Sequence, residues 1–195
     1  LTTEHAFSCA KGGFPSIRHN EIRNITANLL TEVCHNVVIE PDLQPISNEI
    51  MSLSTANTQD AARLDIAADG FWGGSSQRTF FDVRVFSPLS PSNIHSNIAS
   101  SYRRHEKEKK RAYAQRVLEV EHSSFTPLVL SATGGFGSEA KSFYNRLASL
   151  LSEKWNQSFS STVSWLRCRL CFSLLRSAIR ALRGSRSSLG HPGFK

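Results

Sequence analysis

Two aspartates on neighbouring predicted strands are placed to share one divalent cation. Residues 79–86 alternate in the way of a β-strand, with an apolar face made by Phe81, Val83 and Val85. Asp82 and Arg84 therefore lie together on the opposite face. Residues 63–68 alternate in the same way, and Asp65 lies opposite an apolar face made by Leu64, Ile66 and Ala68. Two carboxylates from adjacent strands can converge on one Mg²⁺, which takes a few carboxylate oxygens and keeps its waters.

A lysine on a predicted helix is the next group that could take part in chemistry. The charged helix is expected from about Ile98 to His122, and its most apolar stripe contains Ala99, Tyr102, Glu106, Lys109, Tyr113, Val117 and Val120. Because this stripe must face the sheet, Lys109 needs a negative partner, which the two aspartates or a phosphate bound to them would supply. A solvated basic face is the alternative for Lys109, and it is the interpretation favoured for Lys107 and Lys110.

These groups are expected on an α/β domain with one central mixed sheet of four strands flanked by helices, plus further C-terminal helices. The first helix is predicted to have Ser16 as its N-cap and to carry, at helical spacing, Ile22, Ile25, Leu29 and Val33. The predicted strands cover residues 37–39, 63–68, 79–86 and 127–130, and the last two helices cover 138–154 and 161–183. The chain divides into a terminal loop (1–16), a core (17–155), a basic helix (156–183) and a tail expected to be disordered (184–195).

The chain carries an excess of positive charge that favours a polyanionic partner. Its 195 residues are enough for one domain, and 23 Lys and Arg against 16 Asp and Glu give a net charge of +7. From Glu139 onward there are ten cationic residues and only two acidic ones, Glu139 and Glu153. Nucleic acid is the first interpretation and an anionic membrane surface the second. We expect no membrane-spanning segment, no secretion signal and, with four scattered cysteines, no secreted disulfide framework.

The last predicted helix combines two stripes. Its apolar stripe is Leu166, Leu170, Leu174, Ala178 and Leu182. Its basic stripe is Arg169, Arg176, Arg180 and Arg183. Binding to DNA phosphates fits this arrangement, while a membrane surface and a solvated outer face are the alternatives. Cys168 and Cys171 form a lone C-x-x-C there, which we interpret as two packed thiols rather than a metal or redox site.

Six short motifs, in this order, resemble the region downstream of the reverse transcriptase in site-specific non-LTR retrotransposons. They are His5-Ala-Phe-Ser-Cys9, Arg18-His19-Asn20, Glu40-Pro41, Leu64-Asp65, Asp82-Val83 and Lys109…Tyr113. That region carries a restriction-like endonuclease of the PD-(D/E)xK type, preceded by a zinc knuckle. The resemblance covers about residues 4–133.

The chain departs from the family pattern at three places. Leu64 stands where the family has a proline, and Arg84 stands where the signature lysine belongs, two residues after the second acid. The resemblance implies that this lysine has moved to the following helix, as Lys109. His5 and Cys9 resemble the second half of the knuckle, but the gap between them is one residue shorter than in the family. The first two cysteines of the knuckle are expected upstream in a longer protein.

The resemblance implies a Mg²⁺-dependent DNA endonuclease that nicks target DNA to prime reverse transcription. Asp65 and Asp82 would hold Mg²⁺, and Lys109 would orient the attacking water or offset charge on the phosphate. Arg84 would hold phosphate or steady Asp82, because an arginine does not serve as a base.

Other residues take their expected roles from the same reading. Phosphate contacts are expected from Arg18, His19, Lys110, Arg176, Arg180 and Arg183. For Glu21 a surface carboxylate is the favoured interpretation and a contact with the metal is the alternative, and Zn²⁺ in the full-length protein would use His5 and Cys9. The expected partners are DNA and, through the reverse transcriptase, the element's RNA, in the nucleus and without a membrane. The alternatives to an active nuclease are a catalytically decayed, DNA-binding remnant and a domesticated host protein.

Overall fold

The described part of the chain forms one mixed sheet with helices on both faces. The computed structural model describes residues 13–44 and 63–183. In chain order the elements are α2 (Phe14–Leu30), β1 (His35–Ile39), β2 (Ile66–Asp69), β3 (Arg78–Phe86), α3 (Ile98–Glu119), β4 (Ser124–Ser131), α4 (Ser138–Trp155) and α5 (Phe159–Arg183). The sheet order is β1-β2-β3-β4, with β3 and β4 parallel and the other neighbours antiparallel. The expected α/β class with a mixed four-stranded sheet is confirmed.

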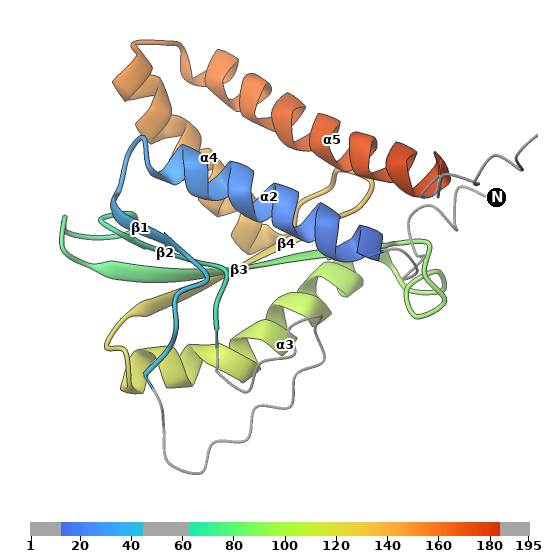
Figure 1. Cartoon of the computed structure of the whole chain (residues 1–195), viewed down its shortest axis with the longest axis horizontal. Helices are drawn as coiled ribbons and strands as arrows, with labels where there is room; N and C mark the ends of the chain where they lie inside the picture. Colours follow the sequence, from blue (N-terminus) through green and yellow to red (C-terminus); the bar gives the residue numbers. More distant parts are fainter. Residues whose placement is uncertain (1–12, 45–62, 184–195) are drawn as a thin grey trace, which may run out of the picture.

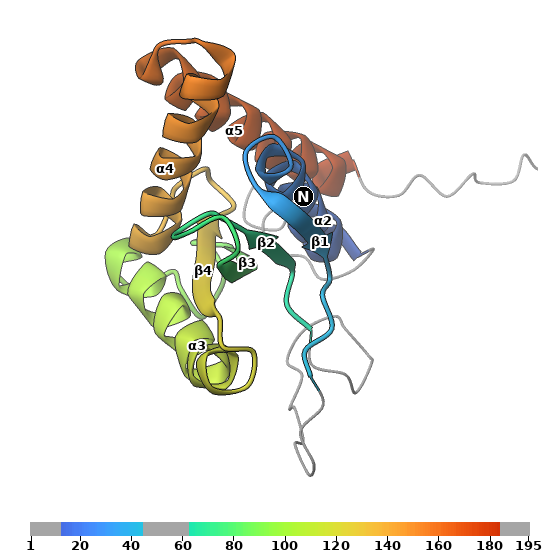
Figure 2. The same ribbon diagram turned by 90° about the vertical axis from the view of Figure 1, so that its left-hand side faces the viewer.

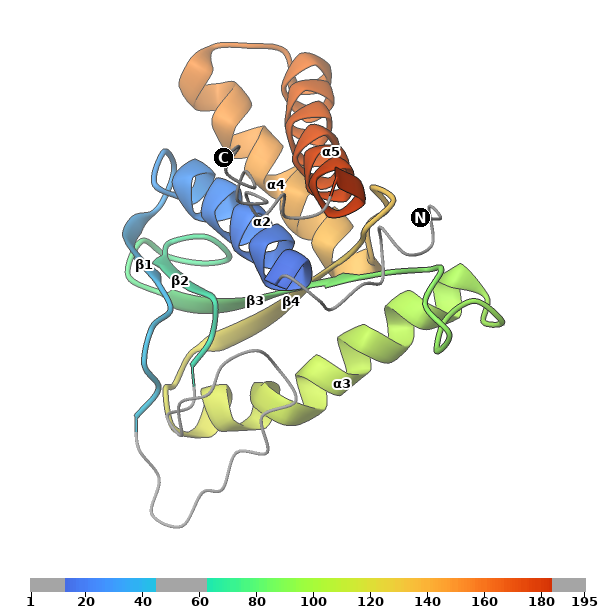
Figure 3. The same ribbon diagram turned by 45° about the vertical axis from the view of Figure 1, so that its right-hand side comes forward.

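The two faces of the sheet are covered differently. Figure 1 shows α2, α4 and α5 on one side and α3 alone on the other, and the turned views in Figures 2 and 3 keep this layering. The side of α2, α4 and α5 holds the large apolar core, which includes Phe81, Val83, Phe143, Leu147 and Leu166. The side of α3 holds a small apolar cluster of Leu43, Leu64, Ala67, Phe80 and Val117.

Strand β3 has the alternation that its sequence predicts. Phe81 and Val83 are buried in the large core, and Val85 packs against it. Asp82 and Arg84 consequently face α3, where both have ion-pair partners on that helix. The strand runs through the middle of the sheet, between β2 and β4, so its polar residues lie deep in the molecule.

Helix α3 is the crossover between the parallel strands β3 and β4, and it also caps the next helix. Its Glu106 carboxylate accepts hydrogen bonds from the Glu139 N–H at 3.0 Å and from the Ser138 hydroxyl at 3.0 Å, at the start of α4. The N-cap residue Gly137 has no side chain to offer, and a Cβ there would lie 2.4 Å from Glu106 Oε1. The buried Glu106 carboxylate therefore satisfies one free N–H and one hydroxyl at the start of another helix.

Helix α2 begins earlier than predicted. Gly13 is its N-cap, with the left-handed backbone angle φ of 70°, and the helix starts at Phe14 with Pro15 in its first turn. Ser16 therefore lies inside the helix, and its prediction as the N-cap was wrong. Proline fits the first turn of a helix because it has no N–H to leave unpaired.

Strand β2 is shorter than the predicted strand at 63–68. The chain bends at Asp65, and the strand begins at Ile66. Ile66 packs in the large core, whereas Leu64 packs in the small cluster on the α3 side. The expectation that Leu64 and Ile66 share one face was wrong, because the bend interrupts the alternation.

Several predictions concern residues that are outside the described ranges. They are the predicted zinc ligands His5 and Cys9, most of the terminal loop expected at 1–16, and the tail expected at 184–195. Both cysteines of the C-x-x-C lie on α5 and are exposed, so the prediction of packed thiols was wrong. Within the described residues, no helix combines the length and the apolar character needed to cross a membrane.

Candidate active site

Asp65 lies beside Asp82 because of the register between β2 and β3. Ile66 pairs with Phe81 across the antiparallel ladder, so one further step places Asp65 opposite Asp82. The ladder stops there, and Asp65 Oδ2 accepts the Val83 N–H at 2.6 Å. The Glu40 N–H donates to the Asp65 carbonyl at 2.9 Å. Backbone groups of two neighbouring segments thus fix both the main chain and the carboxylate of Asp65.

Asp82 forms a buried ion pair with the lysine that the helix stripe singled out. Lys109 Nζ lies 2.7 Å from Asp82 Oδ2, and the two side chains are only 11% and 7% exposed. The ammonium also lies 5.6 Å from the ring centroid of Tyr113, one turn further along α3. The prediction that Lys109 faces the sheet and reaches an aspartate is confirmed.

Charge and burial act against each other in this pair. Burial, together with the negative charge of Asp65, raises the pKa of Asp82 to about 6, although Lys109 works in the opposite direction. Burial alone would lower the pKa of Lys109, but the Asp82 carboxylate outweighs burial and the pKa is raised. Lys109 therefore stays protonated at neutral pH and acts as a cation rather than as a base.

His19 joins the site from the other side of the sheet. Its Nε2 lies 2.8 Å from Asp65 Oδ1, and the histidine side chain is 29% exposed. Burial lowers the pKa of His19, but the hydrogen bond and charge of Asp65 and the charge of Asp82 outweigh it and raise the pKa. The imidazolium form is thus favoured by the two carboxylates beside it. Together, α2, β3, α3 and the bend before β2 bring one histidine, one lysine and two aspartates together.

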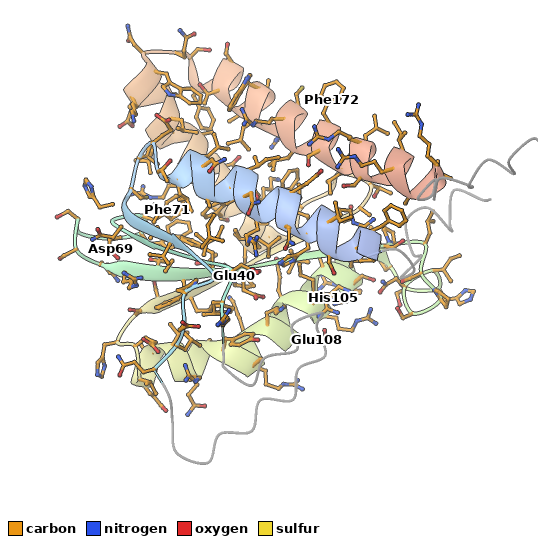
Figure 4. The ribbon with its side chains drawn as sticks, in the orientation of Figure 1. Glu40, Asp69, Phe71, His105, Glu108 and Phe172 are labelled. Carbon is orange, nitrogen blue, oxygen red and sulfur yellow. The ribbon has the colours of Figure 1, made fainter. Side chains whose placement is uncertain are left out.

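An ion pair next to the site links α2 to the segment after β1. Arg23, four residues after His19 on α2, pairs with Glu40, whose own N–H holds the Asp65 carbonyl. Glu40 adopts a left-handed φ of 52°, which is unusual for a residue with a side chain. Figure 4 labels Glu40 where the chain leaves β1, next to the start of β2.

Arg84 does not reach the aspartates. Its guanidinium pairs with Glu108 of α3 at 3.2 Å, and Glu108 also lies 3.3 Å from His105 Nδ1. Figure 4 shows His105 and Glu108 on the same part of α3. Burial first, and then the charge of Arg84, lower the pKa of His105. Arg84 is thus paired with Glu108, the residue next to Lys109 on α3, and the idea that it steadies Asp82 directly was wrong.

The residues predicted to contact nucleic acid have different surroundings. Arg18 is buried, at 5% exposure, and burial lowers its pKa, so it is not presented on the surface. Lys107 is exposed, as expected. Lys110 is also exposed but pairs with Glu139 at the start of α4. The solvated interpretation of these two lysines is confirmed.

Glu21 turns away from the site and joins α2 to α5. Its carboxylate accepts hydrogen bonds from the hydroxyls of Ser173 at 3.0 Å and Ser177 at 3.3 Å. It also pairs with Arg180 at 2.8 Å and with Arg176 at 3.5 Å. The idea that Glu21 reaches a metal was wrong, and two of the predicted phosphate contacts on α5 already have a carboxylate partner. Arg183 is exposed at the end of the helix.

The donors at the site suit Mg²⁺ better than a metal that needs a full protein cage. Asp65 and Asp82 offer hard carboxylate oxygens, and each carboxylate oxygen has lone pairs beyond the hydrogen bond or ion pair that it makes. No group of three or more His, Cys, Asp or Glu side chains within residues 13–44 and 63–183 is arranged to hold a metal. Mg²⁺ is commonly held by one or two carboxylates, waters and substrate phosphate, which fits this pair.

The sequence could have revealed that His19 faces the sheet and needs a polar partner there. His19, Ile22, Arg23, Thr26 and Leu30 recur at helical spacing, so a histidine and an arginine share the stripe of α2 that faces the sheet. Polar residues on such a stripe need partners. The identity of those partners depends on the bend at Asp65 and on the turn at Glu40, which no periodic pattern encodes.

Comparison of the chain with protein-family models gives no match, and comparison with curated proteins gives no significant match. The function must therefore be argued from the geometry of the site and from the motifs of the sequence.

Proposed function

We propose that this chain is a Mg²⁺-dependent DNA endonuclease domain of the restriction-like type. The observation that carries the proposal is that Asp65 and Asp82 lie opposite each other just past the end of the β2–β3 ladder, with the protonated Lys109 paired to Asp82. Two carboxylates with a neighbouring cation match the needs of phosphodiester hydrolysis, which requires a metal site and a group that offsets charge on the phosphate.

Each residue of the site has a distinct part in this proposal. Asp65 and Asp82 would hold Mg²⁺, which when bound lowers the pKa of a water and stabilises negative charge on phosphate. His19 and the Val83 N–H fix the two oxygens of Asp65 and so set the direction of that carboxylate. Lys109 balances the charge of Asp82 and offers an ammonium that can donate to a phosphate oxygen or to the attacking water.

The biological role that we propose follows the resemblance given above. The domain would nick target DNA so that an associated reverse transcriptase can prime on the free end, with the element's RNA as template. This role places the protein in the nucleus and makes DNA its substrate. The net charge of +7 supports a polyanionic substrate in general terms.

Plasmid nicking tests the catalytic part of the proposal. The purified chain should convert supercoiled plasmid to the open circle with Mg²⁺ and not with EDTA. Asp82→Asn and Lys109→Gln should each reduce the rate at least roughly a hundredfold, as expected for loss of a group that acts on the transition state. Lys107→Gln is the matched control, because Lys107 is exposed on the same helix. Equal rates for Lys109→Gln and Lys107→Gln would contradict the role given to Lys109.

A DNA-binding remnant without activity is the second candidate. The specific observation in its favour is that Arg84, at the position of the signature lysine, is paired with Glu108 and is not directed at the aspartates. The remnant predicts salt-dependent DNA binding with no Mg²⁺-dependent nicking by the wild-type chain. Binding that is unchanged in Asp82→Asn, together with absent nicking in both proteins, would favour the remnant over the enzyme.

A further inference from the structure

Helix α5 is apolar on two faces, and only one of them is covered. Its inner face is buried against α2 and α4 and includes Leu166, Leu170, Leu174 and Ala178. Leu182, which was predicted on the same stripe, is exposed instead. Its outer face carries further large apolar residues that stay exposed, although Trp165 at the start of this face also packs edge-on against Trp155 of α4. Figures 1 and 3 show α5 on the outside of the molecule, and Figure 4 shows Phe172 on the side of α5 that points away from α2.

The outer residues follow the spacing of a coiled-coil seam. Steps of three and four alternate without a break over six positions, which we call the outer seam: Trp165, Cys168, Phe172, Leu175, Ile179 and Leu182. Phe172 is 68% exposed and Leu175 is 53% exposed, and the other four are exposed as well. A repeat of 3.5 residues keeps one narrow line of a helix facing a partner helix, so this spacing indicates contact with another helix.

The charge beside the outer seam is uniform. An arginine directly follows the second, fourth and sixth residues of the outer seam. These arginines are Arg169, Arg176 and Arg183. These correspond to the flanking positions of a heptad, which select a partner by charge. Arg169 lies over the Trp165 ring at 5.3 Å, and Arg176 keeps 60% of its side chain exposed although it pairs with Glu21. The whole of α5 has five arginines and neither Asp nor Glu.

Three other occupants fit this surface less well. A second copy of the chain would bring two wholly cationic helices together, which is repulsive. DNA would satisfy the arginines but would leave Phe172 and Leu175 without apolar contact. A helix that lies on a membrane needs a broad apolar face, whereas the outer seam is only two residues wide in each heptad.

We propose that the outer seam of α5 binds an acidic amphipathic helix of a partner protein. The partner would carry apolar residues at the two seam positions of each heptad and Glu or Asp at the positions that meet Arg169, Arg176 and Arg183. This interaction is independent of the proposed nuclease activity, because the seam is on the outside of α5 and contributes no residue to the site of Asp65 and Asp82.

Two synthetic helices test the charge preference. Each peptide spans about four heptads with leucine at the seam positions, and the flanking positions are glutamate in one and lysine in the other. The full chain should bind the glutamate peptide, measured by fluorescence anisotropy, and should bind the lysine peptide at least roughly tenfold more weakly. Equal binding of the two peptides, or binding of neither, would overturn the proposal.

Variants of the seam test its location. Phe172→Gln with Leu175→Gln should weaken binding of the glutamate peptide by roughly tenfold or more. Leu118→Gln, at a position 65% exposed on α3, is the matched control and should leave binding unchanged. Arg169→Glu with Arg183→Glu should reverse the preference toward the lysine peptide. All these positions are exposed, and circular dichroism melts verify that each variant is folded.

If a second copy of the chain or a membrane occupies the outer seam instead, the wild-type chain and the same variants give different results. Light scattering could show that the wild-type chain is a dimer and that Phe172→Gln with Leu175→Gln abolishes the dimer. This result would identify a second copy as the occupant. The chain could instead float with vesicles of phosphatidylserine and phosphatidylcholine, fail to float as the Phe172→Gln and Leu175→Gln variant, and bind the peptides only weakly. That combination would identify a membrane as the occupant. Either result would overturn the acidic helix.

Discussion

The two faces of the sheet bury different kinds of side chain. On the side of α2, α4 and α5, buried side chains such as Phe81, Phe143 and Leu147 are apolar and fully packed. On the side of α3, the helix buries Glu106, Lys109 and His105, which are polar and must be paired. Burial of apolar area stabilises a fold, whereas burial of charge is costly unless it is balanced. The large core thus supports a second face whose buried charges contribute little to stability.

The largest effect is expected from a change in the apolar face. Phe81→Ala should cost about 3–5 kcal/mol of unfolding free energy, because it removes a fully buried ring that packs against Phe71 and Phe143. Urea unfolding followed by circular dichroism measures the loss. Leu118→Ala, at an exposed position of α3, is the control and should change stability by less than about 0.5 kcal/mol. A similar loss in both variants would mean that the core is not concentrated on this face.

The next effect is expected from the charged face and depends on pH. Lys109→Met leaves the buried Asp82 carboxylate without its cation and should cost about 3 kcal/mol at neutral pH. The pKa of Asp82, already about 6, should rise further in this variant. A raised carboxyl pKa in the folded state gives stability that is present at acid pH and is lost as the pH rises through that pKa.

The loss caused by Lys109→Met should therefore be smaller at about pH 5 than at about pH 8. Urea unfolding at the two values measures the difference. Adding Asp82→Asn to Lys109→Met should recover part of the loss at the higher pH, because no buried charge then remains unpaired. A loss that is independent of pH would show that packing of the lysine stem, rather than the ion pair, accounts for the effect.

A smaller effect is expected at the start of α4. Glu106→Ala removes the carboxylate that accepts the Glu139 N–H and should cost about 1–2 kcal/mol, as for loss of a helix cap. Glu119→Ala, also on α3 but exposed, is the control. Thermal melts of the two variants measure the difference, and equal melting temperatures would argue against Glu106 as the cap.

The smallest effect is a change in the protonation of one histidine. The raised pKa of His19 means that the folded state holds its proton more tightly, so the stability gained from it is present at acid pH and is lost as the pH rises through the raised value. Asp65→Asn removes the main carboxylate partner and leaves burial, which lowers the pKa. NMR titration should show a lower pKa for His19 in the variant, with the other histidines as internal controls. An unchanged His19 titration would contradict the pairing with Asp65.

Periodic patterns predicted the parts of this molecule that are periodic. The alternation of Phe81, Val83 and Val85 defined β3 and the face of Asp82, and the stripe of α3 predicted that Lys109 points to the sheet. The alternation at 63–68 was misleading before Ile66, because the bend at Asp65 moves Leu64 to the other side of the sheet. The bend at Asp65 lets its carboxylate accept the Val83 N–H of β3. A pattern within residues 63–68 does not contain this information, because the donor belongs to another strand.

Single charged residues on helix surfaces were the hardest to place from sequence. Glu21 and His19 are two residues apart on α2, yet Glu21 contacts α5 and His19 contacts Asp65. Helical spacing predicts that these two side chains point in different directions. Their contact partners are determined by the packing of α2 between the sheet and α5. The same holds for Arg84, whose partner Glu108 comes from the crossover helix.

The link between α2 and α5 has a consequence for the order of folding. The hydrogen bond from Ser173 to Glu21 joins residues 152 positions apart, and the bond between His19 and Asp65 spans 46. Contacts over such separations form slowly, because a long stretch of chain must be searched and ordered first. During synthesis, the helix that carries His19 acquires all its partners only after α5 has left the ribosome. The helix that carries His19 is therefore incompletely packed until α5 has been synthesised.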